Sequence, residues 1–276
     1  MSSEVEDDEG DLTRKQRREQ ARAQRKALEE EQVASAKRKA RLTQLGIVVA
    51  VVIVAVVAIL IATGGGGSKK VAPHSSEANA TVAEVKTLID GIPQSGNTLG
   101  DPNAPVTLQY FGDLECPICR EFTLGALPSI IQKWVRTGKV KIEYHSLETA
   151  TREPEVFKTQ QVAAYAAGKQ DKAWDFIETF YHEQGEEDSG YVTESYLQGI
   201  AQQVPGLDLT KWTGDRSDPE LANEVEADKQ KANDEGFTGT PSFLIGKTGG
   251  PAQKLEYQSL TEPTSFDEAI EKLLKG

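Results

Sequence analysis

The chemistry of this chain points first to its two cysteines, Cys116 and Cys119, which are separated by two residues. On a helix this spacing puts the sulfurs one turn apart, close enough to form a disulfide. A disulfide that closes so short a loop removes little chain entropy, so it would stabilise the fold little. A close pair in a chain with no other cysteine therefore indicates thiol–disulfide exchange, in which a thiolate attacks a disulfide sulfur.

The residue after the first cysteine, Pro117, suits the first turn of a helix, where the missing N–H costs nothing. Cys116 is then the cap residue, and its sulfur faces the unpaired N–H groups and the positive end of the helix dipole, which favour a thiolate. Cys119 lies one turn further on and is expected to be more buried. The sequence thus predicts Cys116 as the attacking sulfur and Cys119 as the resolving one. Pro117 and Ile118 bring no charge, which predicts a milder oxidant than a site with His there.

The cysteine pair is compatible with two other uses. One is an inert structural disulfide. The other is half of a zinc site, which needs two more ligands, but His74, His145 and His182 show no ligand spacing. We therefore expect no metal and no cofactor other than a redox-active disulfide between Cys116 and Cys119. We expect His145 to be a packed or surface residue, and His182 to be solvated.

A second motif lies near the C-terminus, where Pro241 stands just before a predicted strand. Proline cannot occupy the interior of a central strand, so a tight turn, with a cis peptide bond as one option, fits the start of that strand. An ordinary turn proline is the alternative, and the segment alone does not separate the two.

Hydrophobic periodicity predicts the elements that position these motifs. A strand over 106–112 precedes the cysteines and a helix over 117–136 begins between them. The remaining helices are expected at 76–92, 155–167, 172–182, 193–204, 219–235 and 265–274, and the remaining strands at 140–145, 242–246 and 254–257. This order predicts an α/β or α+β sandwich with a helical insertion over about residues 150–235.

The N-terminal part of the chain differs in composition. Residues 1–44 contain 11 basic and 10 acidic side chains and no apolar stripe, which predicts a solvated tail. Residues 45–63 are uncharged and largely apolar, and 18–20 helical residues span about 27–30 Å, the thickness of a bilayer core. A cleaved signal peptide would have a shorter leader and an apolar region of about 7–15 residues. The run therefore predicts a single transmembrane helix that serves as a signal anchor.

Charge around the apolar run predicts its orientation. The stretch Lys37–Arg41 before the run carries four basic residues, whereas Lys69 and Lys70 beyond it are only two. The more basic side stays in the cytoplasm, so the N-terminal tail is expected there. A glycine-rich tether, residues 64–76, then leads to a domain outside the cytoplasm, where disulfides form and persist. With 20 basic and 33 acidic residues after position 68, that domain has no broad basic face for nucleic acid.

Taken with its surroundings, Cys116-Pro117-Ile118-Cys119 resembles the active site of the DsbA-like branch of the thioredoxin superfamily. Gly239-Thr240-Pro241 resembles that family's cis-proline loop, and the helical block resembles its inserted helical domain. The resemblance covers about residues 77–276. It implies a thioredoxin fold with Cys116 as nucleophile and Cys119 as resolver. It also implies that Pro241 is cis, packs against the disulfide and, with Thr240, presents backbone groups to a substrate peptide.

The function that this resemblance implies is that of a protein disulfide oxidase, held at the membrane by residues 45–63 as in Gram-positive bacteria. Its partners would be unfolded or reduced exported proteins and a membrane protein, quinone-linked in the family, that reoxidises it. Ile118 stands where the best-known members have His, and Thr240 where they have Val, so the direction of exchange stays open. A reductase or isomerase on the same fold is one alternative. A non-enzymatic, tethered binding module with a structural disulfide is the other.

Overall fold

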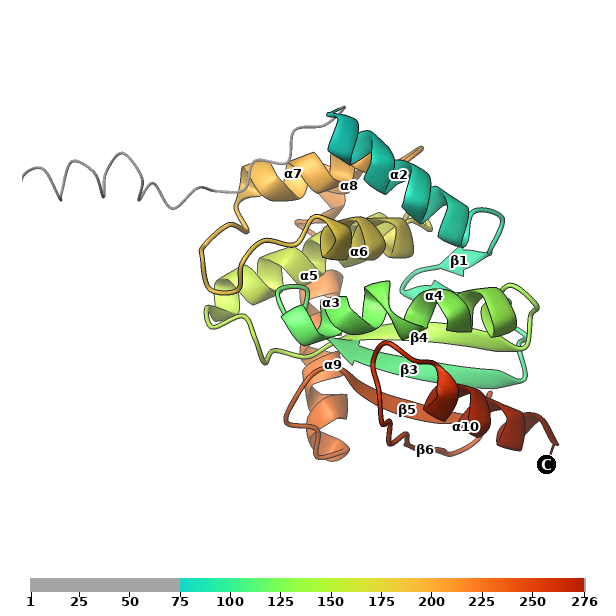
Figure 1. Cartoon of the computed structure of the whole chain (residues 1–276). Coiled ribbons are helices and arrows are strands. Elements are labelled where there is room, and N and C mark those ends of the chain that lie inside the picture. The colour runs from blue at the N-terminus through green and yellow to red at the C-terminus, as the bar shows by residue number, and fades with distance from the viewer. Residues whose placement is uncertain (1–74, 276) are drawn as a thin grey trace, which may run out of the picture. The chain divides into compact units, whose positions relative to one another are not determined.

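The computed structural model describes residues 75–275, all within one compact unit (Figure 1). The expected tail (1–44), the expected transmembrane helix (45–63) and the tether up to residue 74 lie outside the described residues. Within 75–275, no helix has the length and apolar character needed to cross a bilayer.

A six-stranded mixed sheet forms the centre of the domain, in the order β1-β2-β4-β3-β5-β6. Its central pair, β3 (Val106–Gly112) and β4 (Val140–Ser146), is parallel, and the other neighbours are antiparallel. Six of the seven β3 residues are buried, as expected for a strand covered on both faces. The other strands are β1 (Gln94–Ser95), β2 (Thr98–Leu99), β5 (Ser242–Lys247) and β6 (Ala252–Lys254).

Helices α3 (Pro117–Leu124) and α4 (Ala126–Ile130) and a turn of π-helix, η1 (Ile131–Val135), connect β3 to β4. Because β3 and β4 are parallel, the chain needs such a crossover to return to the starting edge of the sheet. The C-terminal α10 (Thr264–Lys275) lies along the same side of the sheet as α3 and α4 in Figure 1.

The expected helical insertion is present between β4 and β5. Its helices are α5 (Pro154–Gly168), α6 (Ala173–His182), α7 (Glu194–Gln203), α8 (Leu209–Asp215) and α9 (Pro219–Asp234). With α2 (Ser76–Ile89), helices α5 to α8 gather into a layer on one side of the sheet (Figure 1). Aromatic side chains fill this layer, and Phe176, Phe180 and Trp212 are buried there. The fold is therefore the thioredoxin type with an inserted helical domain.

One expected helix, over 117–136, is interrupted at Gly125. The backbone of Gly125 is not helical, with φ −103° and ψ −94°. A Cβ atom on this residue would lie 2.6 Å from the carbonyl oxygen of Glu121 and 2.8 Å from that of Leu260. The Leu260 carbonyl also accepts a hydrogen bond from the N–H of Ala126, at 2.9 Å. The helix thus breaks where another segment of the chain crosses it.

Smaller differences concern short elements. The strands β1 and β2 and the helix α8 were not expected from the sequence. The last strand occupies Ala252–Lys254 rather than 254–257. Beyond it, Tyr257 donates a hydrogen bond to the carbonyl of Pro241, at 3.2 Å. The strand prediction there was therefore wrong in its bounds.

Candidate active site

Cys116 lies at the start of α3, beyond the carboxyl end of β3. It is the N-cap residue of the helix, and its sulfur accepts a hydrogen bond from the N–H of Cys119 at 3.3 Å. Pro117 occupies the first turn, so the cap predicted from the sequence is confirmed. Cys116 is 5 % exposed and Cys119 is fully buried, as expected for the second cysteine. Both are free thiols, so this is the dithiol form.

The surroundings shift the pKa values of the two thiols in opposite directions. The pKa of Cys116 falls from its usual 9.0 to about 6. The largest cause is a hydrogen bond from the Cys119 thiol, which lowers the pKa. Burial acts in the opposite direction, and hydrogen bonds from the Thr240 side chain and from backbone N–H groups of α3 lower the pKa further. Burial raises the pKa of Cys119 well above its usual value. At neutral pH the pair therefore holds one thiolate and one thiol.

The loop before β5 approaches the cysteines from the other end of the chain. Its Thr240–Pro241 peptide bond is cis, in agreement with the resemblance noted in the sequence. The Cys116 thiol donates to the Thr240 carbonyl at 3.6 Å, and the Pro241 side chain is buried. A hydroxyl from a third segment, that of Thr149, forms a hydrogen bond with the Thr240 hydroxyl at 2.5 Å. Thr240 thus links three segments that are distant in the sequence, because Cys116 and Thr149 each form a hydrogen bond with it.

Between the cysteines, Pro117 and Ile118 face solvent. Ile118 is 46 % exposed, which is high for a large apolar side chain. The structure therefore places an exposed apolar side chain two residues after Cys116.

Asp113 is a buried scaffold for the site. Its carboxylate accepts hydrogen bonds from the N–H groups of Thr149, Ala150 and Thr151 at 2.9–3.1 Å. It also accepts from the Thr151 hydroxyl at 2.6 Å and from the N–H of Glu115 at 3.1 Å. These bonds compensate the burial of the carboxylate and tie the loop after β4 to the loop that carries Cys116.

Glu115, the residue before Cys116, is also buried. Its pKa is raised from 4.5 to about 7, mainly by desolvation. A hydrogen bond from Thr151 opposes this rise, and the carboxylates of Asp113, Asp188 and Glu187 add to it. This acid therefore titrates near neutral pH, next to Cys116 in the chain.

The end of α6 supports the active-site peptide from the insertion side. The side-chain amide of Gln184 donates to the carbonyls of Leu114 at 2.8 Å and Cys116 at 3.1 Å. The Tyr181 hydroxyl donates to the Asp113 carbonyl at 3.1 Å, and Arg120 donates to the Tyr181 carbonyl at 2.9 Å. Sequence reasoning missed these residues, because nothing in their own segment marks them.

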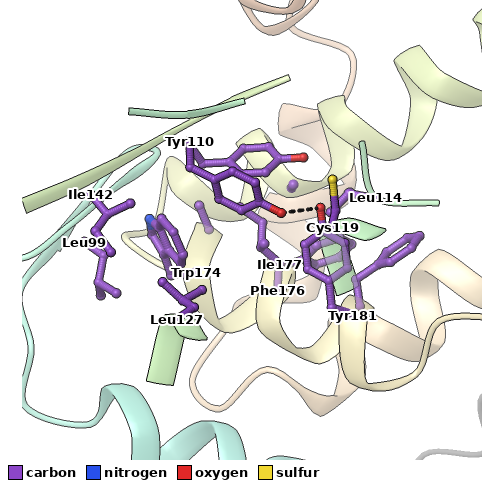
Figure 2. Packing of buried hydrophobic residues seen from close by; sticks show 14 of the residues in the cluster. Leu99, Tyr110, Leu114, Cys119, Leu127, Ile142, Trp174, Phe176, Ile177 and Tyr181 are labelled. Carbon is purple, nitrogen blue, oxygen red and sulfur yellow. Dashed lines mark hydrogen bonds between the residues drawn. The ribbon is translucent and has the colours of Figure 1, made fainter. Parts of the chain in front are cut away.

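Beneath the site, Cys119 belongs to an aromatic core (Figure 2). Tyr110 from β3 donates a hydrogen bond to the hydroxyl of Tyr181 at 3.1 Å. Burial raises the pKa of both phenols well above the usual value, so they stay neutral. The phenols beside the buried sulfur are therefore uncharged.

Two of the histidines can be placed. His145 is packed, as expected: its ring stacks on Phe111 with 4.9 Å between centroids, and its Nδ1 lies 2.6 Å from Asp228. His182 was expected to be solvated, which is wrong, because its side chain is only 18 % exposed. Burial lowers its pKa. His74 lies outside the described residues. In the described part of the chain, no three His, Cys, Asp or Glu residues are grouped to hold a metal ion.

The chain is similar in sequence to known proteins. A family model described as "Thioredoxin" matches residues 94–263. "Probable disulfide bond formation protein D" of Bacillus anthracis is 27% identical over 180 residues, which are 64% of this chain and 78% of that protein. "Disulfide bond formation protein D" of Bacillus subtilis is 25% identical over 183 residues, which are 64% of this chain and 77% of that protein.

Solved structures agree with these relatives. Oxidised BdbD from Bacillus subtilis superposes with a TM-score of 0.56 at 24% identity, covering 68% of this chain and 99% of that chain. DsbA2 from Pseudomonas aeruginosa superposes with a TM-score of 0.52 at 26% identity, covering 67% of this chain and 98% of that chain. Relatives of this kind argue against the non-enzymatic binding module considered above. The chain therefore belongs to the thioredoxin family and is a DsbA-like thiol–disulfide oxidoreductase.

Proposed function

We propose that this oxidoreductase introduces disulfides into exported proteins, with Cys116 as the sulfur that exchanges with substrate and Cys119 as its resolving partner. The observation that carries the proposal is the opposite ionisation of the two thiols, with the pKa of Cys116 lowered to about 6 and that of Cys119 raised by burial. A thiolate stabilised in the dithiol form makes the disulfide more oxidising, because the reduced enzyme is the preferred state.

The reaction starts from the enzyme disulfide. A substrate thiolate attacks the Cys116 sulfur, the Cys116–Cys119 bond breaks, and Cys119 leaves with the electron pair and takes up a proton. A mixed disulfide now joins the substrate to Cys116. A second substrate thiolate attacks the substrate sulfur of that bond, and Cys116 leaves as the stabilised thiolate. The substrate has lost two electrons to the enzyme, and a membrane partner, quinone-linked by family resemblance, must remove them.

Substrate positioning is assigned to Thr240 and Pro241, next to the reacting sulfur. The Thr240 carbonyl lies 3.6 Å from Cys116, so the backbone of this loop is within reach of a peptide bonded to that sulfur. The exposed Ile118 offers an apolar contact on the other side. Both contacts suit unfolded chains, whose backbone groups and apolar side chains are accessible. Pro117 has the separate task of starting the helix that caps Cys116.

The location that fits this function is the outer face of the cell membrane. The proposed anchor is the uncharged run over 45–63, with the N-terminal tail in the cytoplasm and the domain from residue 77 outside it. The test is fractionation of cells that express the whole chain. The chain should resist extraction by alkali and yield a protected N-terminal fragment when protease is added outside intact spheroplasts. Release by alkali would contradict the anchor.

A reductase or isomerase is the second candidate, because Ile118 brings no charge to the site. The reduction potential separates the two. A value near that of thioredoxin, about −270 mV, would favour reduction, and a value well above it would favour oxidation.

The most direct test of the proposed function is trapping of mixed disulfides in cells. With Cys119→Ala no Cys116–Cys119 disulfide can form, but the Cys116 thiolate can still attack a disulfide of an exported protein and displace the other substrate sulfur as a thiolate. Cys119 is then absent and cannot release the mixed disulfide, so adducts with exported proteins should accumulate and disappear on reduction. Cys116→Ala is the matched control and should trap none. If Cys119→Ala traps no exported protein, the proposed function is wrong.

A further inference from the structure

The loop that follows β4 brings an exposed hydroxyl, that of Thr149, to the cis-proline loop. The Oγ1 atoms of Thr149 and Thr240 are 2.5 Å apart, with either hydroxyl able to donate. The backbone under Thr149 is fixed, because its N–H and the next two N–H groups all donate to the buried Asp113 carboxylate. The side chain is therefore presented to Thr240 by a rigid support.

Thr240 is also the residue of its loop that contacts the cysteines. Its carbonyl accepts from the Cys116 thiol, and its side chain contributes to lowering the pKa of Cys116. A hydroxyl has one hydrogen to donate and two lone pairs to accept with. If Thr240 gave its hydrogen to Thr149, none would remain for the sulfur. If Thr149 is the donor, the Thr240 hydrogen is free to point at Cys116.

We propose that Thr149 is a positioning residue that acts through Thr240. Its hydroxyl donates to Thr240 Oγ1 and thereby directs the Thr240 hydrogen at the Cys116 sulfur whenever that sulfur is a thiolate. Charge-assisted hydrogen bonds are stronger than neutral ones, so this relay favours the dithiol over the disulfide form of the enzyme. The inference rests on the proposed role of Cys116 and adds to it a residue that tunes how strongly the site oxidises.

The test compares Thr149→Val, which keeps the shape and removes the hydroxyl, with the unchanged protein. Two quantities are measured in vitro: the pH midpoint of Cys116 ionisation and the equilibrium with glutathione. We expect the midpoint to rise by roughly half a unit or more. The equilibrium should shift about threefold or more toward the enzyme disulfide. A midpoint that falls would mean that Thr149 withholds the Thr240 hydrogen, and an unchanged one that it has no influence. Either result overturns the proposal.

A double mutant separates this relay from a general structural effect. In a Thr240→Val background, Thr149→Val should change neither quantity, because the group it acts through is gone. A full effect in that background would overturn the proposal. Thr149→Ser, which keeps the hydroxyl, should restore both quantities, and its failure to do so would count against the relay.

Thr107→Val is the matched control. It removes another Thr–Thr hydroxyl bond, 2.8 Å between Thr107 and Thr248, at the far end of β3 from Cys116. It should leave both quantities unchanged, and a shift as large as that of Thr149→Val would contradict a specific role for Thr149. These readouts need neither cells nor a client protein. Failure of the Thr149 relay is therefore distinguishable from failure of Cys119→Ala to trap exported proteins.

Discussion

At the scale of residues, the two cysteines have the same side chain but different surroundings. The Cys116 sulfur caps a helix and receives hydrogen bonds, whereas Cys119 is sealed one turn further on among apolar and phenolic groups. Burial penalises any thiolate, and only Cys116 has the donors that outweigh the penalty. The proposed roles of Cys116 as attacking sulfur and Cys119 as resolving sulfur rest on this difference.

Glu115 gives a prediction at the same scale. Its pKa is raised in the folded state to about 7, so its contribution to stability is full below the unfolded value of 4.5 and is lost as the pH rises through 7. Glu115→Gln removes the charge and keeps the shape. It should raise the free energy of unfolding by about 1 kcal/mol at about pH 8, a figure discounted for partial exposure, and by little at about pH 4.

Chemical denaturation at the two pH values checks this prediction. Glu121→Gln, on the exposed face of α3, is the matched control and should show no such pH-dependent gain. An equal gain from Glu115→Gln at both pH values would show that charge is not the cause.

The sequence predicted those site residues that form a recognisable motif with their neighbours in the chain. Cys116 with Pro117, and Thr240 with Pro241, carry their own local signals, and the structure brings both pairs together. Thr149 carries none. Its importance depends on a contact with a residue 91 positions away in the chain, and a single sequence does not display such pairings.

At the scale of elements, α3 is held at its start by the end of α6. Gln184→Leu removes the donor that serves the carbonyls of Leu114 and Cys116, leaving two acceptors without it. We expect a loss of about 1–3 kcal/mol in the free energy of unfolding, together with faster amide exchange over 114–120. Gln198→Leu, on the exposed surface of α7, should produce neither change. If amide exchange over 114–120 is unchanged in Gln184→Leu, Gln184 does not hold the start of α3 in place.

The break between α3 and α4 gives a second prediction at this scale. A methyl group at Gly125 would collide with backbone atoms of Glu121, Leu260 and Thr261. Gly125→Ala should therefore destabilise the protein by about 2 kcal/mol or more, measured by denaturation. Gly214, in α8, has no atom near the added methyl, so Gly214→Ala should be neutral or stabilise by about 0.5–1 kcal/mol. Equal effects of the two substitutions would refute the role of the crossing segment.

The sequence located the long elements well because their apolar residues recur with a clear period. β3 was predicted with the bounds it has, and the insertion was expected between β4 and β5. The interruption at Gly125 was missed because an isolated glycine is compatible with a continuous helix. Its cause is a segment about 135 residues further along the chain. The strands β1 and β2 are two residues each, too short to show a period.

At the scale of the whole molecule, the site is assembled where three parts of the fold meet. The sheet supplies the loop that ends in Cys116, the insertion supplies the support from α6, and the segment before β5 supplies Thr240. Because these parts belong to one domain, the ionisation of a single sulfur is linked to the stability of the entire fold.

This linkage predicts how the reduced and oxidised forms differ. The lowered pKa of Cys116 stabilises the folded dithiol form fully above pH 9, and this contribution is lost as the pH falls through 6. The disulfide form has no such group. The reduced form should therefore gain stability over the oxidised form by about 2 kcal/mol, discounted for solvent screening, between about pH 6 and 9. Parallel denaturation of the two forms measures the difference, and a pH-independent difference would contradict it.

The most direct measurement is the ionisation of Cys116 itself, followed by the ultraviolet absorbance of the thiolate in the reduced protein, with the oxidised protein as the blank. The lowered pKa of Cys116 predicts the appearance of one thiolate with a midpoint near pH 6. A first midpoint at about 8.5 or above, that of an ordinary free thiol, would contradict it, because Cys116 would then have neither the reactivity nor the leaving ability that the proposed exchange requires.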